Sequence, residues 1–153
     1  MAIDIDEWLP EDAASVRALF IELELEDQGN YDTPERTRSE IERRTGEPAP
    51  TFQGENCIFV AKDSGDVVGI CWCVIYDPGT GLEGELAELY VKPGLRGQGV
   101  GEKLVDRAIQ LFKYRGVVFA SVWTADENNS AMHLYQKAGF ERSKQTVLTW
   151  HPR

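Results

Sequence analysis

Apolar residues recur at the spacing of an α-helix in two long stretches of the chain, residues 10–28 and 100–115. In the first stretch the apolar face comprises Val16, Leu19, Phe20 and Leu23. In the second it comprises Val100, Leu104, Val105, Ala108, Leu111 and Phe112. A shorter, more polar helix is expected over residues 33–44, with Thr33 as its N-cap. Together with a further short helix after residue 128, the pattern predicts four helices.

Strand-like patterns fill the middle of the chain. Residues 56–62 and 67–76 flank the turn-forming run Asp63-Ser64-Gly65-Asp66, so they predict a β-hairpin, and residues 83–92 predict a third strand. Residues 117–123 form a continuous apolar run after the second long helix. Such a run is typical of a strand that is covered on both faces and lies parallel to the strand before the helix.

Each end of the chain also carries a short strand signal. Ile3, Ile5 and Trp8 suggest a first strand, and residues 146–150 suggest a last one. The order of elements therefore indicates an α/β (α+β) protein in which helices cover the faces of a mixed sheet.

Length and composition are those of an ordinary soluble domain. The chain has 153 residues, of which 42% are hydrophobic and 27% charged, so one domain spanning residues 1–153 is expected. The start of the chain lacks a basic segment followed by an apolar one, and the longest apolar run, residues 70–76, is too short to cross a bilayer. These features predict a cytoplasmic protein without a membrane partner.

The cysteines argue against a disulfide framework. The three cysteines, Cys57, Cys71 and Cys73, are odd in number, and Cys71 and Cys73 would share one face of a strand. No histidine lies near them and the Cys-x-x-Cys spacing is absent. We therefore expect buried strand cysteines and no metal site.

The net charge of −10 is concentrated at one end of the chain. Residues 1–50 carry 14 acidic residues against five arginines, a net charge of −9. This surface argues against nucleic acid as a partner, because nucleic-acid binding requires a basic surface. It would attract a cationic partner, or it would serve only as a solvated helical surface.

The most informative stretch of the chain is Arg96-Gly97-Gln98-Gly99-Val100-Gly101, which follows a strand and opens a helix. Alternate glycines let the backbone turn tightly with several N–H groups facing one point, and the helix N-terminus adds partial positive charge. An anion is the expected occupant. Two common nucleotide motifs are excluded, because Glu102 stands where a dinucleotide fingerprint needs glycine and no Gly-Lys-Ser/Thr is present.

A second motif follows about thirty residues later. Asn128 would cap a short helix that ends at Gly139 and Phe140. Two segments then carry a family resemblance: Leu89-Tyr90-Val91-Lys92-Pro93 with Arg96-x-x-Gly99-x-Gly101, and Asn128-x-x-Ala131-x-x-Leu134-Tyr135-x-Lys137-x-Gly139-Phe140. The first resembles the acetyl-CoA signature of the GNAT superfamily of N-acetyltransferases, and the second resembles a later segment of the same family.

The resemblance implies a single-domain fold and a cofactor. The expected fold is a mixed, mostly antiparallel twisted sheet of about six to seven strands flanked by about four helices. The two central parallel strands would splay apart in a V that receives acetyl-CoA. The residues implied in binding it are Leu89, Tyr90, Val91, Arg96, Gly97, Gln98, Gly99, Val100, Gly101, Asn128 and Tyr135.

The resemblance further implies direct transfer of an acetyl group to an amine in a ternary complex. Tyr135 would protonate the departing thiolate. An amine that arrives protonated needs a base, and Glu88 and Glu85 are the candidates, with Glu88 slightly preferred. Both residues sit on the strand that would present the thioester, but their side chains are expected to point to opposite faces. A surface role is expected for His133.

The acceptor is the least determined part of the prediction. In this family the first two helices usually form one side of the acceptor site. The corresponding segment of this chain contains Glu24, Glu26, Asp27 and Asp32. A cationic small-molecule amine, resembling an aminoglycoside or a polyamine, is therefore the expected acceptor. Peptide or protein amines, a non-catalytic acyl-CoA-binding module and a homodimer with a shared pocket stay open as alternatives.

Overall fold

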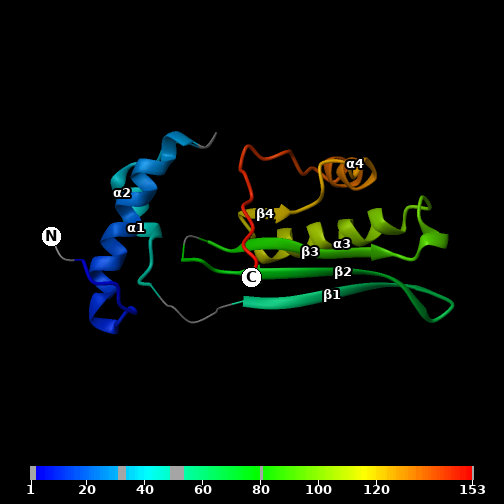
Figure 1. Cartoon of the computed structure of the whole chain (residues 1–153), viewed down its shortest axis with the longest axis horizontal. Helices are drawn as coiled ribbons and strands as arrows, with labels where there is room; N and C mark the ends of the chain where they lie inside the picture. Colours follow the sequence, from blue (N-terminus) through cyan, green and yellow to red (C-terminus); the bar gives the residue numbers. More distant parts are fainter. Residues whose placement is uncertain (1–2, 31–33, 49–53, 80, 153) are drawn as a thin grey trace.

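The computed structural model of the protein describes residues 3–30, 34–48, 54–79 and 81–152. Its α-helices are α1 (Ala13–Asp27), α2 (Arg38–Arg44), α3 (Val100–Arg115) and α4 (Asn129–Lys137). Its strands are β1 (Gly54–Asp63), β2 (Asp66–Tyr76), β3 (Glu83–Val91) and β4 (Phe119–Val122). Short 3-10 turns are η1 (Pro10–Asp12), η2 (Gln28–Asn30) and η3 (Pro93–Leu95). Figure 1 shows α1 and α2 at one end of the sheet and α4 toward the other end.

The four strands form one sheet in the order β1-β2-β3-β4. The first three are antiparallel, and β4 lies parallel to β3, as its sequence pattern predicts. The predicted hairpin between β1 and β2 is confirmed. Its two turn residues, Ser64 and Gly65, have φ values of 50° and 92°. Two successive positive φ values match the turn whose twist fits a hairpin.

The main core lies between α3 and one face of the sheet. From α3 it receives Leu104, Val105, Ala108 and Phe112, four of the six residues of the predicted face. From the sheet it receives Cys71, Cys73, Ile75, Leu86 and Val91. The helix amphipathicity read from the sequence therefore fixes which side of α3 meets the sheet. The two buried thiols lie 3.9 Å apart, on one strand face as expected.

A β-bulge in β3 changes the face on which its acidic residues lie. Trp72 pairs with Glu88, but its neighbour Cys73 pairs with Leu86, so Ala87 is an extra residue in β3. Glu85 pairs with Val74, which lies two residues from Trp72 on β2 and therefore on the same face. Glu85 and Glu88 thus share the face away from α3. The expectation of opposite faces is wrong, because one inserted residue shifts the alternation of side chains.

The pairing between β3 and β4 is short. It runs from Glu83 with Phe119 to Leu86 with Val122, and β3 then continues to Val91 without β4 beside it. The two central parallel strands therefore part at the bulge. This opening is where the V-shaped gap of the sequence prediction would lie.

The described residues form four strands, not the six to seven expected. Residues 3–9 and 144–152 are not strands, because they form no ladder with a described strand, and Ile5 and Leu148 are 89% and 91% exposed. Without a neighbour on its outer side, β4 is an edge strand. The expectation that β4 is covered on both faces is therefore also wrong, as Phe119 is 53% exposed.

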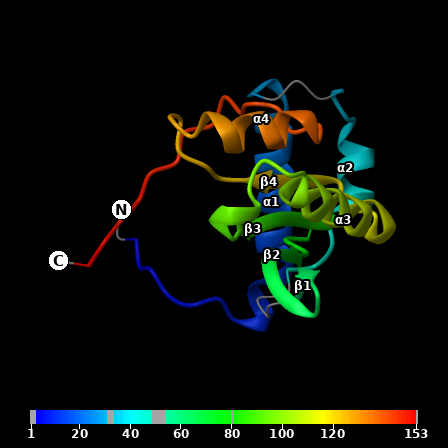
Figure 2. The same ribbon diagram turned by 90° about the vertical axis from the view of Figure 1, so that its right-hand side faces the viewer.

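The N-terminal helices differ from expectation in their caps and in their packing. Helix α2 begins at Arg38 because Thr37 and Glu40 form a reciprocal capping box, whereas the expected cap Thr33 lies outside the described residues. Helix α1 packs against α2 at the end of the sheet (Figure 2), so only Ile21 is buried. Leu19, on the predicted face, is 68% exposed because no sheet surface covers it.

No described helix is long and apolar enough to cross a membrane. Within the described parts of the chain, histidine, cysteine and acidic side chains do not gather into a group that could hold a metal ion.

Candidate active site

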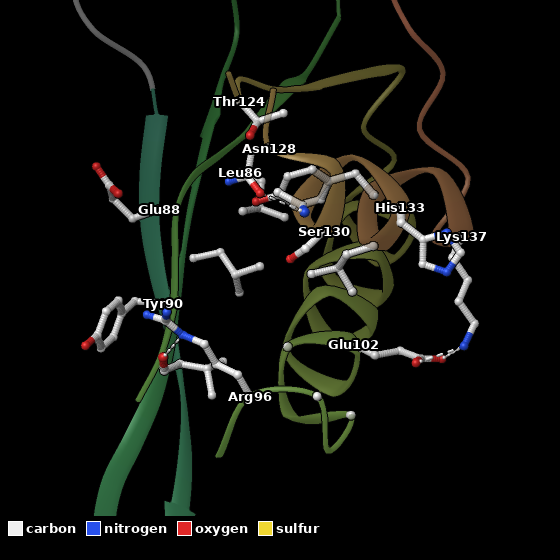
Figure 3. A pocket seen from close by; sticks show the side chains of 18 of the residues that line it. Leu86, Glu88, Tyr90, Arg96, Glu102, Thr124, Asn128, Ser130, His133 and Lys137 are labelled. Atoms are coloured by element: carbon white, nitrogen blue, oxygen red, sulfur yellow. Dashed lines mark hydrogen bonds and ion pairs between the residues drawn. The ribbon is translucent and has the colours of Figure 1, made fainter. Parts of the chain in front are cut away.

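A pocket of about 660 Å³ occupies the opening where β3 leaves β4 (Figure 3). One wall is the part of β3 from Leu86 to Val91. A second is the glycine turn with the first turn of α3, and a third is α4. The end of β4 adds Trp123 and Thr124. The two sequence motifs, thirty residues apart in the chain, thus face each other across one cavity.

The glycine turn has the geometry of an anion cradle. Gly97 and Gly99 have φ values of 73° and 80°, which side chains rarely adopt, and the space beside both is open. Gly99 is the N-cap of α3 and provides no side-chain cap, so the first N–H groups of the helix have no intrahelical partner. A Cβ at Gly101 would stand 3.4 Å from Leu134, so this glycine lets α3 approach α4. The groups of this turn that could bind a phosphate are therefore backbone N–H donors.

The other predicted cofactor residues lie around this turn. Arg96 donates from Nε to the Val91 carbonyl at 2.9 Å, and its guanidinium carbon lies 5.5 Å from the centre of the Tyr90 ring. These contacts hold a positive charge where β3 ends. Leu89, Tyr90 and Val91 line the pocket, whereas Gln98 and Val100 are not among its lining residues. Gln98 instead donates to the Gly94 carbonyl and closes the turn.

Helix α4 is fixed by its cap and by an aromatic contact. The Asn128 side chain accepts a hydrogen bond from the Ala131 N–H at 3.2 Å, as an N-cap does. Tyr135 is 8% exposed and meets Phe140 edge-on, with ring centres 6.0 Å apart. Burial, together with the charges of Cys71 and Glu88, raises the pKa of Tyr135. Its hydroxyl therefore keeps its proton at neutral pH and can serve as a donor.

Of the two candidate bases, the structure brings only Glu88 to the pocket. Figure 3 shows its side chain on the far side of β3 from the helices, beside that of Tyr90. Glu85 shares that face but is not a lining residue. It lies near Tyr76, whose pKa is raised to about 12 by a hydrogen bond to Glu83, by burial, and by the charges of Glu83 and Glu85.

Several lining residues were not predicted. They are Leu86, Ala87, Glu102, Trp123, Thr124, Ser130, Ala131, His133, Leu134 and Lys137. His133, for which a surface role is expected, is exposed, and it lies one turn before Lys137 at the edge of the pocket. The Lys137 ammonium lies 2.8 Å from the Glu102 carboxylate of α3, and this contact raises the pKa of Lys137. The four-residue spacing of His133 and Lys137 places both on one face of a helix, and this spacing is the sequence feature that could have predicted their shared position at the pocket.

Of the acidic residues predicted for the acceptor, those that the structure describes do not line this pocket. Glu24, Glu26 and Asp27 belong to α1, which Figure 1 places at the opposite end of the sheet from the glycine turn, and Asp32 lies outside the described residues. Part of the acidic charge is also balanced within the helical pair. Glu24 lies 3.4 Å from Arg36, and Glu22 receives two hydrogen bonds from Arg38.

Comparison with known sequences identifies relatives of this chain. Residues 17–140 match the family model described as the acetyltransferase (GNAT) family. An uncharacterized N-acetyltransferase of Methanocaldococcus jannaschii is 33% identical over 99 residues, covering 63% of this chain and 43% of that protein. The mycothiol acetyltransferase of Thermobifida fusca is 34% identical over 127 residues, covering 76% of this chain and 38% of that protein. The chain thus spans about two fifths of the length of these relatives.

Solved structures share the fold across nearly the whole chain. An aminoglycoside acetyltransferase from an uncultured soil metagenomic sample, solved in complex with sisomicin, has a TM-score of 0.56 at 15% identity, covering 98% of this chain and 95% of that one. A transcriptional regulator from Bacillus halodurans has a TM-score of 0.56 at 19% identity, covering 98% and 99%. At these identities the similarity establishes the GNAT-like fold alone, and proteins with different names share it.

Proposed function

Because the chain belongs to the acetyltransferase (GNAT) family, we propose that it is an N-acetyltransferase that moves an acetyl group from acetyl-CoA to a primary amine. One observation carries this proposal. The pocket joins a backbone anion cradle to a buried tyrosine, and the carboxylate of Glu88 stands on the other side of the same strand. The cradle would bind the phosphate groups of the acetyl donor, the tyrosine would donate a proton, and the Glu88 carboxylate would act as the base. A single domain over residues 1–153 would suffice to hold them.

The residues of the pocket fit acetyl-CoA. The N–H groups between Gly97 and Gly101 would hold its pyrophosphate, with Arg96 adding positive charge. The side of β3 away from β2 would receive the pantetheine arm at Leu89 and Tyr90, because no described strand pairs with these residues on that side. When bound, acetyl-CoA supplies an activated acetyl group whose thioester carbon accepts an amine.

Two side chains of the site would then each transfer one proton. An acceptor amine with a pKa of about 10 in solution is mostly protonated at neutral pH, so Glu88 takes a proton from its ammonium group. Tyr135 holds a proton at its hydroxyl and gives it to the leaving thiolate. Direct attack within a ternary complex needs no protein nucleophile, which agrees with the burial of Cys71 and Cys73.

The acceptor in this proposal is a cationic small molecule. Glu88 and Glu85 lie on one face of β3, so a protonated amine approaching that face meets two carboxylates. Helix α1 contributes little to this attraction, because charges are screened over a Debye length of about 8 Å at physiological salt. The preference for cationic acceptors should therefore depend on Glu88 and Glu85 more than on Glu24, Glu26 or Asp27.

The donor site is tested by calorimetric titration with acetyl-CoA. The wild type should bind at micromolar strength, and Gly99→Glu should bind much more weakly, because a carboxylate would occupy and repel the phosphate site. Gly116→Glu is a matched control. Gly116 also has a positive φ and open space beside it, but it lies at the opposite end of α3. Absence of acetyl-CoA binding by the wild type would refute the proposal.

Catalysis is tested by release of CoA thiol with a panel of primary amines. Cationic, neutral and acidic acceptors should be compared at low and high salt. We expect turnover with at least one cationic amine and an apparent affinity that weakens as salt rises. Binding of acetyl-CoA without turnover of any amine would instead favour a non-catalytic acyl-CoA-binding module.

A homodimer forms the last part of this proposal. The outer edge of β4 pairs with no described residue, and a cavity of about 820 Å³ lies between β4 and residues 140–147. Val147, Leu148 and Trp150 nearby are exposed. A second copy could pair its residues 146–150 with this edge, because an open strand edge attracts another strand. Sedimentation velocity should detect the dimer, and Val147→Pro should yield monomers because it removes an amide donor.

A further inference from the structure

The α4 wall of the pocket carries a lysine and a histidine that the glycine turn does not require. His133 and Lys137 stand one helical turn apart, and both line the cavity. Figure 3 shows their side chains on the same side of α4, at the edge of the pocket beside Glu102. The side chains of Lys137 and Glu102 are 58% and 43% exposed, so a ligand can reach them.

Glu102 explains why a cation is needed at this edge. It lies in the first turn of α3, where a carboxylate stabilises the helix but also repels an anion bound at the same N-terminus. Lys137 approaches both of its oxygens, at 2.8 and 2.9 Å. The ammonium therefore cancels the repulsion. Glu102 follows Gly99 by three residues, so its backbone lies roughly 4.5 Å along the helix axis from the glycine turn.

Building on the proposed function, we propose that Lys137, assisted by His133, binds the phosphate monoester at the ribose 3′ position of CoA. With the pyrophosphate held by the glycine turn, Lys137 and His133 would receive this phosphate at the edge of the pocket. A phosphate monoester carries close to two negative charges at neutral pH and accepts charge-assisted hydrogen bonds. The site would therefore select CoA thioesters over dephospho-CoA thioesters and over thioesters of pantetheine alone.

The test compares CoA with dephospho-CoA by calorimetry. The wild type should bind CoA about five- to twentyfold more tightly, a range that allows for the exposure of Lys137. In Lys137→Gln this ratio should fall to near one. In Glu102→Gln both ligands should bind more tightly while the ratio persists. His133→Gln should reduce the ratio by a smaller factor.

Lys103→Gln is the matched control, because Lys103 neighbours Glu102 on α3 but does not line the pocket. It should leave the ratio unchanged. Equal binding of CoA and dephospho-CoA by the wild type would overturn this inference and leave the proposed function intact. An equal weakening of both ligands in Lys137→Gln would also overturn it, since Lys137 would then act only on Glu102. Failure of the wild type to bind either ligand would count against the proposed function itself.

Discussion

Gly84 in β3 offers a sharp test of how the sheet packs on α3. A Cβ built there would lie 2.8, 3.0 and 3.1 Å from three carbons of the Phe112 ring, whereas ordinary contacts are 3.4–4 Å. Phe112 is itself buried in the core. Gly84→Ala therefore forces the ring or the strand to move, and such overpacking costs about 1–3 kcal/mol.

One effect of alanine opposes this cost. Alanine reduces the freedom of the unfolded chain, which returns about 0.4–1 kcal/mol. We therefore expect a net loss of about 1–2 kcal/mol in the free energy of unfolding. At about 2–4 °C per kcal/mol for a chain of this size, the midpoint of thermal unfolding should fall by roughly 2–8 °C.

The assay is thermal and urea unfolding of Gly84→Ala beside Gly46→Ala. Gly46 has no atom within 4 Å of a built Cβ and no positive φ, so its alanine variant should stay within about 0.5 kcal/mol of the wild type. Phe112→Leu in the Gly84→Ala background should cost less than the sum of the two changes, because the smaller side chain relieves the contact. Unchanged stability of Gly84→Ala, or strict additivity, would refute the packing described.

Three further changes test the site and one helix. Tyr135→Phe should lower turnover roughly ten- to a thousandfold with nearly unchanged CoA affinity, because it removes only a proton donor. The raised pKa of Tyr135 predicts that wild-type activity does not fall in the pH range in which an ordinary tyrosine begins to lose its proton. Steady-state kinetics that show equal turnover, with chemistry rate-limiting, would assign Tyr135 to packing. Glu88→Gln should reduce turnover most at low pH, where free amine is scarcest, and more than Glu85→Gln; equal small effects would indicate a water chain. Thr37→Ala should lower the unfolding free energy by about 0.5–2 kcal/mol through loss of the α2 cap, whereas Thr37→Ser should retain most of it.

The sequence predicted those features that depend on neighbouring residues. The hairpin at Ser64 and Gly65, the buried face of α3 and the Asn128 cap follow from local backbone preferences and helical spacing, and all three are present. The glycine turn was recognisable for the same reason, because positive φ values at Gly97 and Gly99 are a local property of glycine.

Only the tertiary structure decided which distant residues meet. The bulge at Ala87 depends on pairing with β2, and that single inserted residue places Glu85 and Glu88 on one face. The end segments carry strand-like patterns but form no ladder, since a strand exists only through its partner. The pairing of Lys137 with Glu102 joins two helices, and the acidic charge of α1 lies away from the pocket, at the other end of the sheet. Such contacts depend on how the elements pack in space, which spacing along the chain does not encode.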